Sequence, residues 1–439
     1  MKNIVLFGAG RSSIYLVEYL QAWCVKNNYM LIIGDKDVQY VQDNVKEKDN
    51  LQFQTIDIFD HEKVEALIKI SELVISLLPA ALHMHIAHLC LDNHKHMATA
   101  SYVSDEMKAI HDDAINKGLI FLNECGLDPG IDHMSAMQLM DNIKSKGGII
   151  NSFESYCGGL VANACDGDNP WKYKFSWNPR NVVVAGQGAP AQFLLDGQLK
   201  VLPYHQLFAY TKDFTIGNHG TFEAYPNRDS LKYRPLYGLD HIATMVRGTF
   251  RKQGYASAWQ VLVVLGLTDD TTKLYYPQGT TMQQWLTTYM VHPYQDLKNA
   301  VKTATHCTDA DIAKLEWLGL FGNEVLPLYE GTSAQILEEI LKIKWLLLPN
   351  DRDMVVMLHK IGYQLNGENK AATSTLVIEG ESNTHTAMAK TVGLPLAIAC
   401  RLILENKISQ RGVVVPVDCE LYTPVLEELK GFGIHFIEN

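Results

Sequence analysis

Residues 123–133, NECGLDPGIDH, place two acids in a turn with two glycines and a proline, directly after the apolar run GLIFL. Asp128 is a favoured helix N-cap and Pro129 a favoured first helical residue. Because positions 136, 140 and 143 are apolar at helical spacing, a helix is predicted to follow. The turn also closes an apolar strand, where α/β sheets bind ligands. Asp128 could therefore hold an amine or a water besides capping the helix, whereas Asp132 is interpreted as structural.

Three arginines form a second group with a chemical preference. Arg228 lies in YPNRDS, and Arg247 and Arg251 flank a Gly-Thr pair in VRGTFR. A guanidinium group binds a carboxylate through two parallel hydrogen bonds. Arginines beside glycines and aromatic residues in an acidic chain therefore indicate carboxylate binding, with surface ion pairing as the alternative for each of them.

Histidines and cysteines offer weaker signals. The histidine run lacks an HExxH motif or a cysteine partner, so no metal site is predicted. Cys157 in SYCGG has no evident neighbouring base, and it is interpreted as the wall of a pocket rather than a nucleophile. The histidines in question are His83, His85, His88, His94 and His96.

The elements that must position these groups begin with an alternating pattern. An apolar run at residues 2–7 ends in GAGRSS, an amphipathic stretch covers residues 14–23, and a second apolar run ends at Asp35. This order is typical of a dinucleotide-binding βαβ unit, in which glycines let the backbone approach a pyrophosphate at a helix N-terminus. Ser13 replaces the third glycine of the fingerprint, so an ordinary glycine-containing turn is the alternative.

Asp35 bears on the choice of cofactor. A carboxylate at the end of the second strand accepts hydrogen bonds from the ribose hydroxyls and repels a 2′-phosphate. NAD(H) is therefore expected, although Lys36 could reach a phosphate and leaves NADP(H) open.

The remaining sequence divides into three parts. Strand and helix patterns alternate over the first ~128 residues and predict a parallel sheet of about six strands. Residues ~130 to ~250 are aromatic-rich and glycine-punctuated, which indicates a mixed or antiparallel sheet, and residues ~255–345 are mostly helical in pattern. Strand patterns return in DMVVMLHKIGYQL and TSTLVIEG, and a long apolar helix, AMAKTVGLPLAIACRLILEN, follows.

Composition excludes some classes of partner. The formal net charge is −11, and no cluster of five or more Lys/Arg occurs, which argues against nucleic acid. No apolar stretch of 18 residues is expected to span a membrane, and the chain runs straight into structure. The eight cysteines lack paired spacing, so a reducing, cytoplasmic setting is expected.

Ten ordered blocks give the chain a family resemblance. VISLLP, TASYVS, GLDPGIDHM, SYCGGL, DNPWKYKFSW, YPNRDS, RGTFRKQGY, EWLGLFG, RDMVVMLHK and AMAKTVGLPLAIA resemble the signatures of glutamate-forming saccharopine dehydrogenase, or saccharopine reductase. The resemblance implies an α/β fold with three parts. These are a Rossmann-type parallel sheet (1–128, completed by about 387–439), a mixed α+β substrate and dimerisation domain (129–254 and 346–386), and an inserted all-α domain (255–345).

The resemblance also implies an activity in lysine metabolism. An oxidoreductase acting on CH–NH groups would oxidise the secondary amine of saccharopine with NAD⁺, and hydrolysis of the imine would yield L-glutamate and 2-aminoadipate 6-semialdehyde. A cytoplasmic homodimer with a small amino-acid substrate is expected.

Residues carried over by motif fall into three sets. The proton transfers are assigned to Asp128 and Tyr102. The substrate contacts would be Ser101, Tyr102, Asp128, Cys157, Arg228, Thr249, Phe250 and Arg251. The cofactor contacts would be Gly8, Ala9, Gly10, Arg11, Ser12, Asp35, Asp57, Ile58, Leu77, Thr99, Ala100, Leu127, Asp128, Pro129 and Asn178.

The chain departs from the family pattern in three places. The first turn reads GAGRSS, whereas the family usually has an aromatic residue and a small or β-branched residue after the second glycine, so Arg11 is expected to meet the pyrophosphate. VANACDG replaces Pro-Ala-Pro-Glu after CGGL, and Ala80 replaces a tyrosine after SLLP.

The alternatives to a saccharopine dehydrogenase are a related C–N oxidoreductase, such as a carboxynorspermidine-type dehydrogenase, and a non-catalytic NAD(H)-sensing protein.

Overall fold

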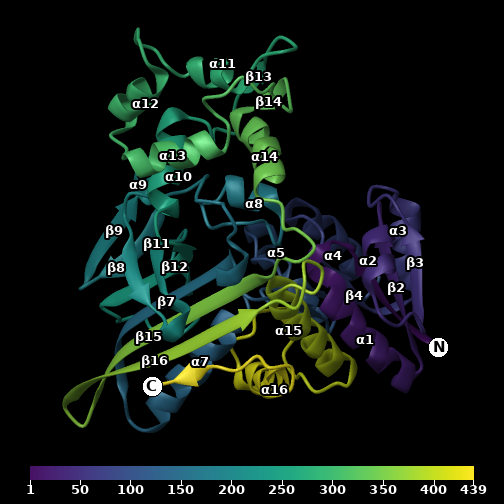
Figure 1. Ribbon diagram of the computed structural model, residues 1–439. Helices are drawn as coiled ribbons and strands as arrows, with labels where there is room; N and C mark the ends of the chain where they lie inside the picture. Colours follow the sequence, from purple (N-terminus) through teal and green to yellow (C-terminus); the bar gives the residue numbers. More distant parts are fainter. The chain divides into compact units, whose positions relative to one another are not determined.

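The computed structural model describes residues 1–439, which form two compact units (Figure 1). Unit 1 comprises residues 1–149 and 380–439, and unit 2 comprises residues 150–379. The division differs from the expected boundaries at 128 and 387. Helix α7 (Ile131–Ser145) belongs to unit 1 because it packs on α16 (Cys419–Lys430), where the Tyr422 hydroxyl donates to Asp141 Oδ2 at 2.6 Å.

Unit 1 contains a parallel sheet of seven strands in the order β17-β6-β5-β4-β1-β2-β3. The order reverses between β1 and β4, and the carboxyl edge at such a switch point is where open α/β sheets bind ligands. The expected Rossmann-type sheet is confirmed, and the C-terminal segment completes it through β17. The strands are β1 (Lys2–Phe7), β2 (Tyr29–Asp35), β3 (Leu51–Thr55), β4 (Ser71–Ser76), β5 (His96–Thr99), β6 (Ile120–Leu122) and β17 (Gly412–Val414).

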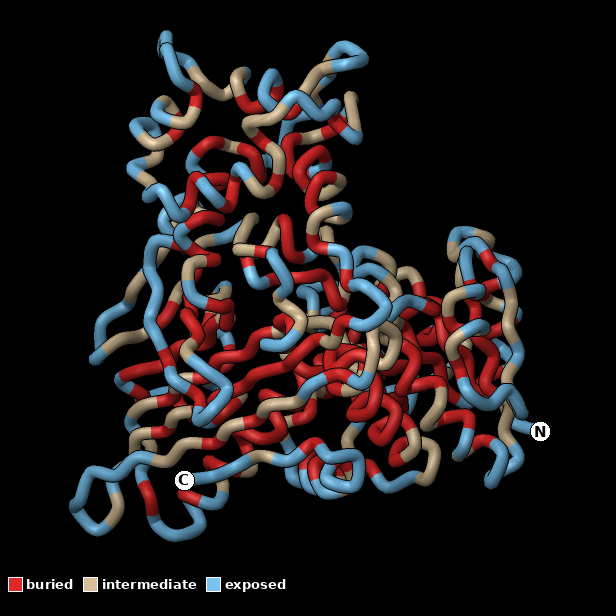
Figure 2. The backbone as a smooth tube through the Cα atoms, viewed as in Figure 1, coloured by how far each residue is buried: buried red, intermediate tan, exposed pale blue.

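Helices cover the strands of unit 1, as the apolar runs require. Ile4, Val5 and Leu6 of β1 are fully buried, so side chains pointing to both faces are removed from water. Figure 2 colours the buried parts of the backbone red. The helices are α1 (Ile14–Asn27), α2 (Gln39–Asn44), α3 (His61–Lys69), α4 (His83–Asp92), α5 (Asp105–Ala109), α6 (His111–Asn116), α7, α15 (Ala387–Leu404) and α16, with 3₁₀ turns at η1 (Arg11–Ser13) and η2 (Ala80–Leu82); β18 (Ile437–Glu438) lies near the C-terminus.

Helix α15 is apolar because it is a core helix of unit 1. It has 18 residues and a mean hydropathy of 1.6, so the expectation that no stretch matches a membrane span in length and composition was wrong. Most of the helix, 78%, is buried inside the protein. Gly393 lets α15 approach α1 closely, since a Cβ there would lie 2.9 Å from Leu16 N.

Unit 2 is built on a mixed sheet with strands in the order β10-β11-β12-β7-β15-β16, with β8 on β12 and β9 on β8. The pair β12–β7 is parallel. Asn366 and Gly367 both have positive φ, which suits the two-residue turn that joins β15 to β16. The strands are β7 (Ile149–Val161), β8 (Ala191–Leu195), β9 (Gln198–Leu202), β10 (Lys212–Thr215), β11 (Thr221–Pro226), β12 (Thr244–Lys252), β15 (Asp353–Leu365) and β16 (Glu368–Glu379).

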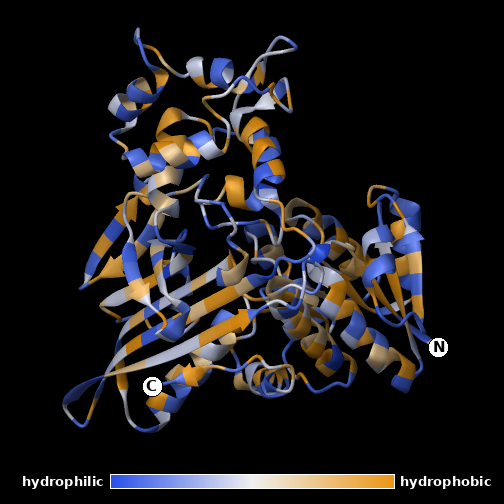
Figure 3. Cartoon of the chain, viewed as in Figure 1, coloured by the Kyte–Doolittle hydropathy of each residue, from blue (hydrophilic) through white to orange (hydrophobic).

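Residues 255–345 are mainly helical, with one small two-stranded sheet. Three helices begin with capping boxes, which satisfy main-chain N–H groups at their starts. Helix α14 alternates apolar and polar faces (Figure 3) and buries Ile336, Leu337 and Ile340. The elements are α10 (Tyr255–Leu265), β13 (Lys273–Tyr275), α11 (Met282–Thr287), α12 (Leu297–Thr305), α13 (Asp309–Trp317), β14 (Glu330–Thr332) and α14 (Ser333–Lys344).

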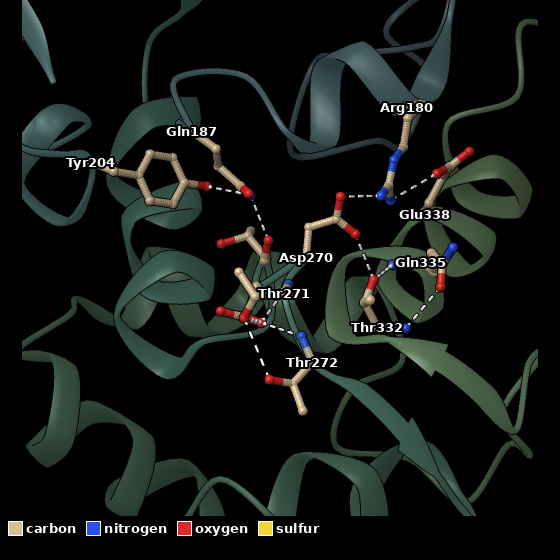
Figure 4. A network of polar contacts seen from close by, with 11 residues as sticks. Arg180, Gln187, Tyr204, Asp270, Thr271, Thr272, Thr332, Gln335 and Glu338 are labelled. Carbon is tan, nitrogen blue, oxygen red and sulfur yellow. Dashed lines mark hydrogen bonds and ion pairs between the residues drawn. The ribbon is translucent and has the colours of Figure 1, made fainter. Parts of the chain in front are cut away.

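A polar network links this helical region to the rest of unit 2 (Figure 4). Arg180 of α8 (Pro179–Val183) pairs with Asp270 and with Glu338 of α14. Asp270 Oδ1 also accepts from the Thr332 hydroxyl at 2.7 Å. Gln187 donates to the Thr268 carbonyl at 2.5 Å. Short helix α9 (Tyr204–Leu207) and the 3₁₀ turns η3 (Asn163–Cys165), η4 (Gly217–His219) and η5 (Leu231–Tyr233) complete the unit.

Replacing Gly393 with alanine should destabilise unit 1 by ~1–3 kcal/mol through overpacking, even though alanine is the better helix former by ~1 kcal/mol. Chemical denaturation measures this change. Gly10→Ala is the control: its Cβ would meet no atom within 4 Å and its φ is −78°, so stability should stay within ~0.5 kcal/mol. A gain of stability in Gly393→Ala would contradict the close approach of α1 and α15.

Candidate functional site

The glycine-rich loop after β1 leaves main chain open at the start of η1 and α1. Gly8 has a φ of +103°, and a Cβ there would lie 2.7 Å from the Leu77 carbonyl carbon, so glycine is required where β1 and β4 end side by side. Gly10 instead borders open space. The N–H groups at a helix start bind phosphate, so this loop fits the pyrophosphate of a dinucleotide.

Asp35 is a main-chain acceptor in this structure. Its Oδ2 accepts from Ala9 N–H at 2.7 Å and its Oδ1 accepts from Asp37 N–H at 3.0 Å. The carboxylate therefore holds the glycine-rich loop against the turn after β2. These two hydrogen bonds give Asp35 a structural role that does not depend on a contact with a ribose.

Positive charge lies beside Asp35. Arg11 and Lys36 are exposed, and the buried hydroxyl of Tyr40 has no hydrogen-bond partner. Burial raises the pKa of Tyr40, and the nearby positive charge of Arg11 opposes that shift. Two cations and an unused hydroxyl near the end of β2 suit a phosphate group.

The other predicted cofactor residues of unit 1 follow the neighbouring strands. Asp57 and Ile58 come after β3, Leu77 after β4, and Thr99 ends β5, so one edge of the sheet gathers them. Asn178 belongs to unit 2, where its side chain accepts from Arg180 N–H at 3.0 Å and caps α8.

Asp128 and Tyr102 form a pair at the same edge. The Tyr102 hydroxyl donates to Asp128 Oδ1 at 3.1 Å, which joins the loops after β5 and β6. The predicted capping role of Asp128 was wrong, because Gly130 is the N-cap and α7 begins at Ile131. The Asp128–Pro129 peptide bond is cis. Asp128 is therefore a loop carboxylate that accepts a hydrogen bond from a phenol.

The loop is closed on itself before α7. A Cβ on Gly130 would lie 2.0 Å from the Gly126 carbonyl oxygen, so no other residue fits. Asp132 Oδ1 accepts from Gly130 N–H at 2.6 Å, which agrees with a structural role for this buried acid.

Sequence reasoning missed the buried acid that fixes these loops. Glu124 is 3% exposed and has a φ of +54°. Its Oε1 accepts from Val103 N–H at 2.9 Å, and its Oε2 bonds His133 Nε2 at 2.9 Å. Glu124 N–H donates to the Ser101 carbonyl. The pair Glu124–His133 therefore sets the position of the segment that carries Ser101 and Tyr102.

In unit 2, one face of the mixed sheet gathers the predicted carboxylate-binding residues. Residues opposite each other in the register share a face. Thr249 of β12 lies opposite Cys157 of β7 and Tyr225 of β11. Arg247 and Arg251 lie two residues to either side of Thr249 on the same face. A thiol, two hydroxyls and two guanidinium groups therefore line this surface.

Arg251 is a buried cation without an acid partner. It is 5% exposed, and its guanidinium lies 5.1 Å, 5.2 Å and 5.9 Å from the ring centroids of Tyr173, Tyr255 and Tyr225. It donates to the Phe250 carbonyl, and its Nε has no hydrogen-bond partner. Glu223, opposite in the register, instead accepts from Gly254 and Ala256 N–H at the start of α10. The tyrosine-walled guanidinium suits an incoming carboxylate.

One predicted substrate residue of unit 2 points away from the arginine face. The Phe250 side chain is fully buried on the opposite face of β12, in the core with Tyr156 and Phe214, so its side chain does not reach the arginine face. The Phe250 side chain therefore does not share the surroundings of Arg251. Arg228 is exposed in the loop after β11 and has a φ of +49°.

The segment that departs from the family pattern is anchored away from the arginine face. Asp166 pairs with Lys252 at 2.7 Å, and Lys252 leaves β12 on the face opposite Arg251. Cys165 Sγ accepts from Arg352 N–H at 3.3 Å. The altered residues thus have structural partners within unit 2.

The sheet order and the open loop at its carboxyl edge define the class of dinucleotide-binding Rossmann proteins. Comparisons with known proteins narrow this class. Two protein-family models match the chain. The family model described as Saccharopine dehydrogenase NADP binding domain matches residues 4–122, and the family model described as Saccharopine dehydrogenase C-terminal domain matches residues 126–434. The chain belongs to the saccharopine dehydrogenase family.

Individual relatives agree with the family. The chain is 31% identical to saccharopine dehydrogenase [NADP(+), L-glutamate-forming] of Saccharomyces cerevisiae, over 100% of this chain and 99% of the yeast protein. Against mitochondrial alpha-aminoadipic semialdehyde synthase of Mus musculus it is 34% identical over 99% of the chain, and it spans 47% of that protein. The solved apo histidine-tagged saccharopine dehydrogenase (L-Glu forming) from Saccharomyces cerevisiae superposes with a TM-score of 0.88 at 30% identity, covering 100% of this chain and 99% of that one.

Arg251→Met should weaken the binding of a dicarboxylate probe such as glutarate at least tenfold, by about 1.4 kcal/mol or more, because the buried cation is lost. Stability should change by only ~1 kcal/mol, since lost cation–π contacts are offset by removal of an unpaired buried charge. Titration calorimetry and denaturation measure the two effects.

The comparator is Lys252→Met, one residue along β12. Here an acid partner, Asp166, would be left without its cation, so stability should fall by ~1–3 kcal/mol while glutarate binding stays unchanged. Equal glutarate binding by the wild type and Arg251→Met would contradict the assignment of Arg251 as a carboxylate-binding residue.

Proposed function

We propose that the chain catalyses the NADP-linked oxidation of the secondary amine of saccharopine, with release of L-glutamate and 2-aminoadipate 6-semialdehyde. The observation that carries the proposal is the Tyr102–Asp128 pair at the carboxyl edge of a dinucleotide-binding sheet. The names of the yeast and mouse relatives support the substrate.

The reaction removes a hydride from the carbon beside the secondary amine and a proton from its nitrogen. A bound nicotinamide cofactor would supply the acceptor for this hydride. The resulting imine adds water, and the C–N bond then breaks to leave a primary amine and an aldehyde. Water is consumed, and the proton transfers need an acid–base group within hydrogen-bond reach.

Asp128 is assigned to these proton transfers. As a carboxylate it accepts the amine proton during oxidation, and as an acid it returns a proton to the departing nitrogen. The Tyr102 hydroxyl stabilises the negative charge and orients the carboxylate through its hydrogen bond. Positioning of the carbon that loses hydride supplies much of the remaining rate enhancement.

The arginine face of unit 2 is assigned to the carboxylates of the substrate. Saccharopine carries three carboxylates, and Arg251 offers a desolvated guanidinium that no acid of the chain neutralises. Arg247, stacked 4.2 Å from the Tyr233 ring centroid, lies on the same face. An extended tricarboxylate is thus favoured over a smaller amino acid.

NADP(H) is proposed in preference to the NAD(H) expected from Asp35. Both Asp35 oxygens accept main-chain N–H groups, which draws their negative charge toward the loop. Arg11, Lys36 and the unused Tyr40 hydroxyl supply partners for a 2′-phosphate, so Arg11 is assigned to that phosphate rather than to the pyrophosphate expected from the sequence. The name of the family model for residues 4–122 and that of the yeast relative point the same way.

A steady-state assay with saccharopine, following reduced cofactor with NADP⁺ and NAD⁺ side by side, tests the proposal. Turnover with a higher kcat/KM for NADP⁺ is expected. Absence of turnover with both cofactors would rule out the proposed function.

Asp128→Asn should lower kcat by ~10²–10⁴-fold because it removes the group that accepts the proton. Asp141→Asn is a matched control, since Asp141 also accepts from a tyrosine hydroxyl in unit 1 but lies on α7, and its kcat should remain at the wild-type value. Stopped-flow or steady-state kinetics measures kcat for the two variants. A folded Asp128→Asn protein with full kcat would exclude the catalytic role.

Arg11→Ala should lower kcat/KM for NADP⁺ by ~10-fold or more and leave that for NAD⁺ nearly unchanged, because only NADP⁺ carries the 2′-phosphate. Asp35→Ser should weaken both cofactors alike, since Ala9 N–H loses its acceptor. An Asp35→Ser protein that merely gains activity with NADP⁺ would show that Asp35 reads the ribose instead.

A further inference from the structure

His83 lies in a buried chain of hydrogen bonds behind the carboxyl edge of unit 1. Its Nδ1 lies 2.8 Å from Ser76 Oγ, and its Nε2 lies 2.6 Å from Ser101 Oγ. His83 is the first residue of α4, Ser76 ends β4, and Ser101 follows β5. Three consecutive elements of the sheet edge are therefore joined through one imidazole.

The ring is neutral. His83 is 5% exposed, and burial lowers its pKa to about 4. No group of three His, Cys, Asp or Glu side chains in the chain could hold a metal ion, so the ring's nitrogens serve its two serines. A neutral imidazole donates through one nitrogen and accepts through the other. The chain of hydrogen bonds consequently has a single direction.

Ser76 decides that direction. Its side chain is fully buried, and its Oγ has one hydrogen-bond partner, His83 Nδ1. A buried hydroxyl whose hydrogen has no acceptor is destabilising, so Ser76 donates to Nδ1 and Nε2 carries the ring hydrogen. Thr99 is also buried, and donation from its Oγ1 to Nε2 would require the opposite tautomer, but that contact is 3.5 Å long, at the outer limit for a hydrogen bond, and is weaker than the 2.8 Å contact of Ser76. Thr99 Oγ1 accepts from Ser101 N–H.

We propose that His83 is a positioning residue: it donates from Nε2 to Ser101 Oγ and thereby turns the Ser101 hydroxyl hydrogen toward the ligand. Ser101 is partly exposed, whereas Ser76 and His83 are buried. The group recognised is an oxygen acceptor, either a carboxylate of the substrate or the carboxamide of the nicotinamide. This inference rests on the proposed function for its kinetic test but not for its spectroscopic one.

The tautomer is directly measurable. Long-range ¹H–¹⁵N correlation spectra of the histidine-labelled chain, with His83→Gln to assign the resonance, report which ring nitrogen carries the hydrogen. The Nε2–H tautomer is expected. An Nδ1–H tautomer would overturn the proposed direction.

Two near-isosteric variants separate the two hydrogen bonds of His83. Glutamine places an amide nitrogen near the Nε2 position and can still donate to Ser101, whereas asparagine reaches only the Nδ1 position and its bond with Ser76. His83→Asn should lower kcat/KM for saccharopine by about tenfold, while His83→Gln should retain most activity yet melt at a lower temperature. Losses of activity that simply follow the losses of stability would overturn the positioning role.

A double-mutant cycle completes the test. In a Ser101→Ala background, His83→Asn should cause no further loss of kcat/KM, because its effect passes through the Ser101 hydroxyl. A full additional loss would contradict the proposal. If His83→Asn fails to fold, Ser101→Ala and the tautomer measurement still decide.

The source of the ligand oxygen is separated by two readouts. If Ser101→Ala raises the KM for saccharopine and leaves the Kd for NADPH, measured by fluorescence, unchanged, the ligand oxygen belongs to the substrate carboxylate. If it raises the Kd for NADPH and leaves the KM for saccharopine unchanged, the oxygen belongs to the carboxamide. Unchanged values of both in Ser101→Ala would exclude a ligand contact. A wild-type protein without turnover would refute the proposed function alone, since the tautomer and the NADPH titration remain measurable.

Discussion

A parallel sheet brings every loop that follows a strand to one edge, and those loops lack the regular hydrogen-bond ladder of the strands. Their main-chain groups must still be paired. In unit 1 a few acids meet this demand. Asp35 accepts from the loop after β1, and Glu124 accepts from the loop after β5. The arrangement of the loops at this edge, and with it the distance between Tyr102 and Asp128, depends on these contacts.

The same demand explains why the acids at this edge differ in role. Asp132 and Glu124 are buried and have donors from the main chain or a histidine, so their charge is used in holding the loops. Asp128 accepts a hydrogen bond from the Tyr102 hydroxyl, which joins the loops after β5 and β6. In unit 2 the situation is inverted, since Arg251 is a buried cation surrounded by tyrosine rings rather than by acids.

The sequence predicted the fold well because its signals are local. The run before Gly8, the acid at Asp35 and the apolar strands each report on a few neighbouring residues, and together they define the βαβ order. The N-cap assigned to Asp128 was wrong because the local preference of Asp-Pro was overridden by the tight return of Gly130 onto Gly126. The grouping of α7 with unit 1 could not be read from local signals, since its packing on α16 joins residues far apart in the chain.

The missed parts of the site share a different property. His83 was weighed only as a metal ligand, because its serine partners come from β4 and from the loop after β5. The tyrosines around Arg251 come from three separate segments, and no spacing in the sequence links them. Alternation along β12 could have placed Arg247, Thr249 and Arg251 on one face and Phe250 on the other. The burial of Arg251, by contrast, required the surrounding helices and strands.

Completion of the first sheet by β17 has a consequence for biosynthesis. Residues 1–149 leave the ribosome long before β17, α15 and α16, whereas residues 150–379 form a contiguous stretch. Until the last sixty residues appear, β6 has an unpaired edge and α1 lacks the helix that covers it. Such exposed edges and apolar faces favour association with other chains. The parallel sheet of unit 1 is therefore completed only after residues 150–379 have been synthesised.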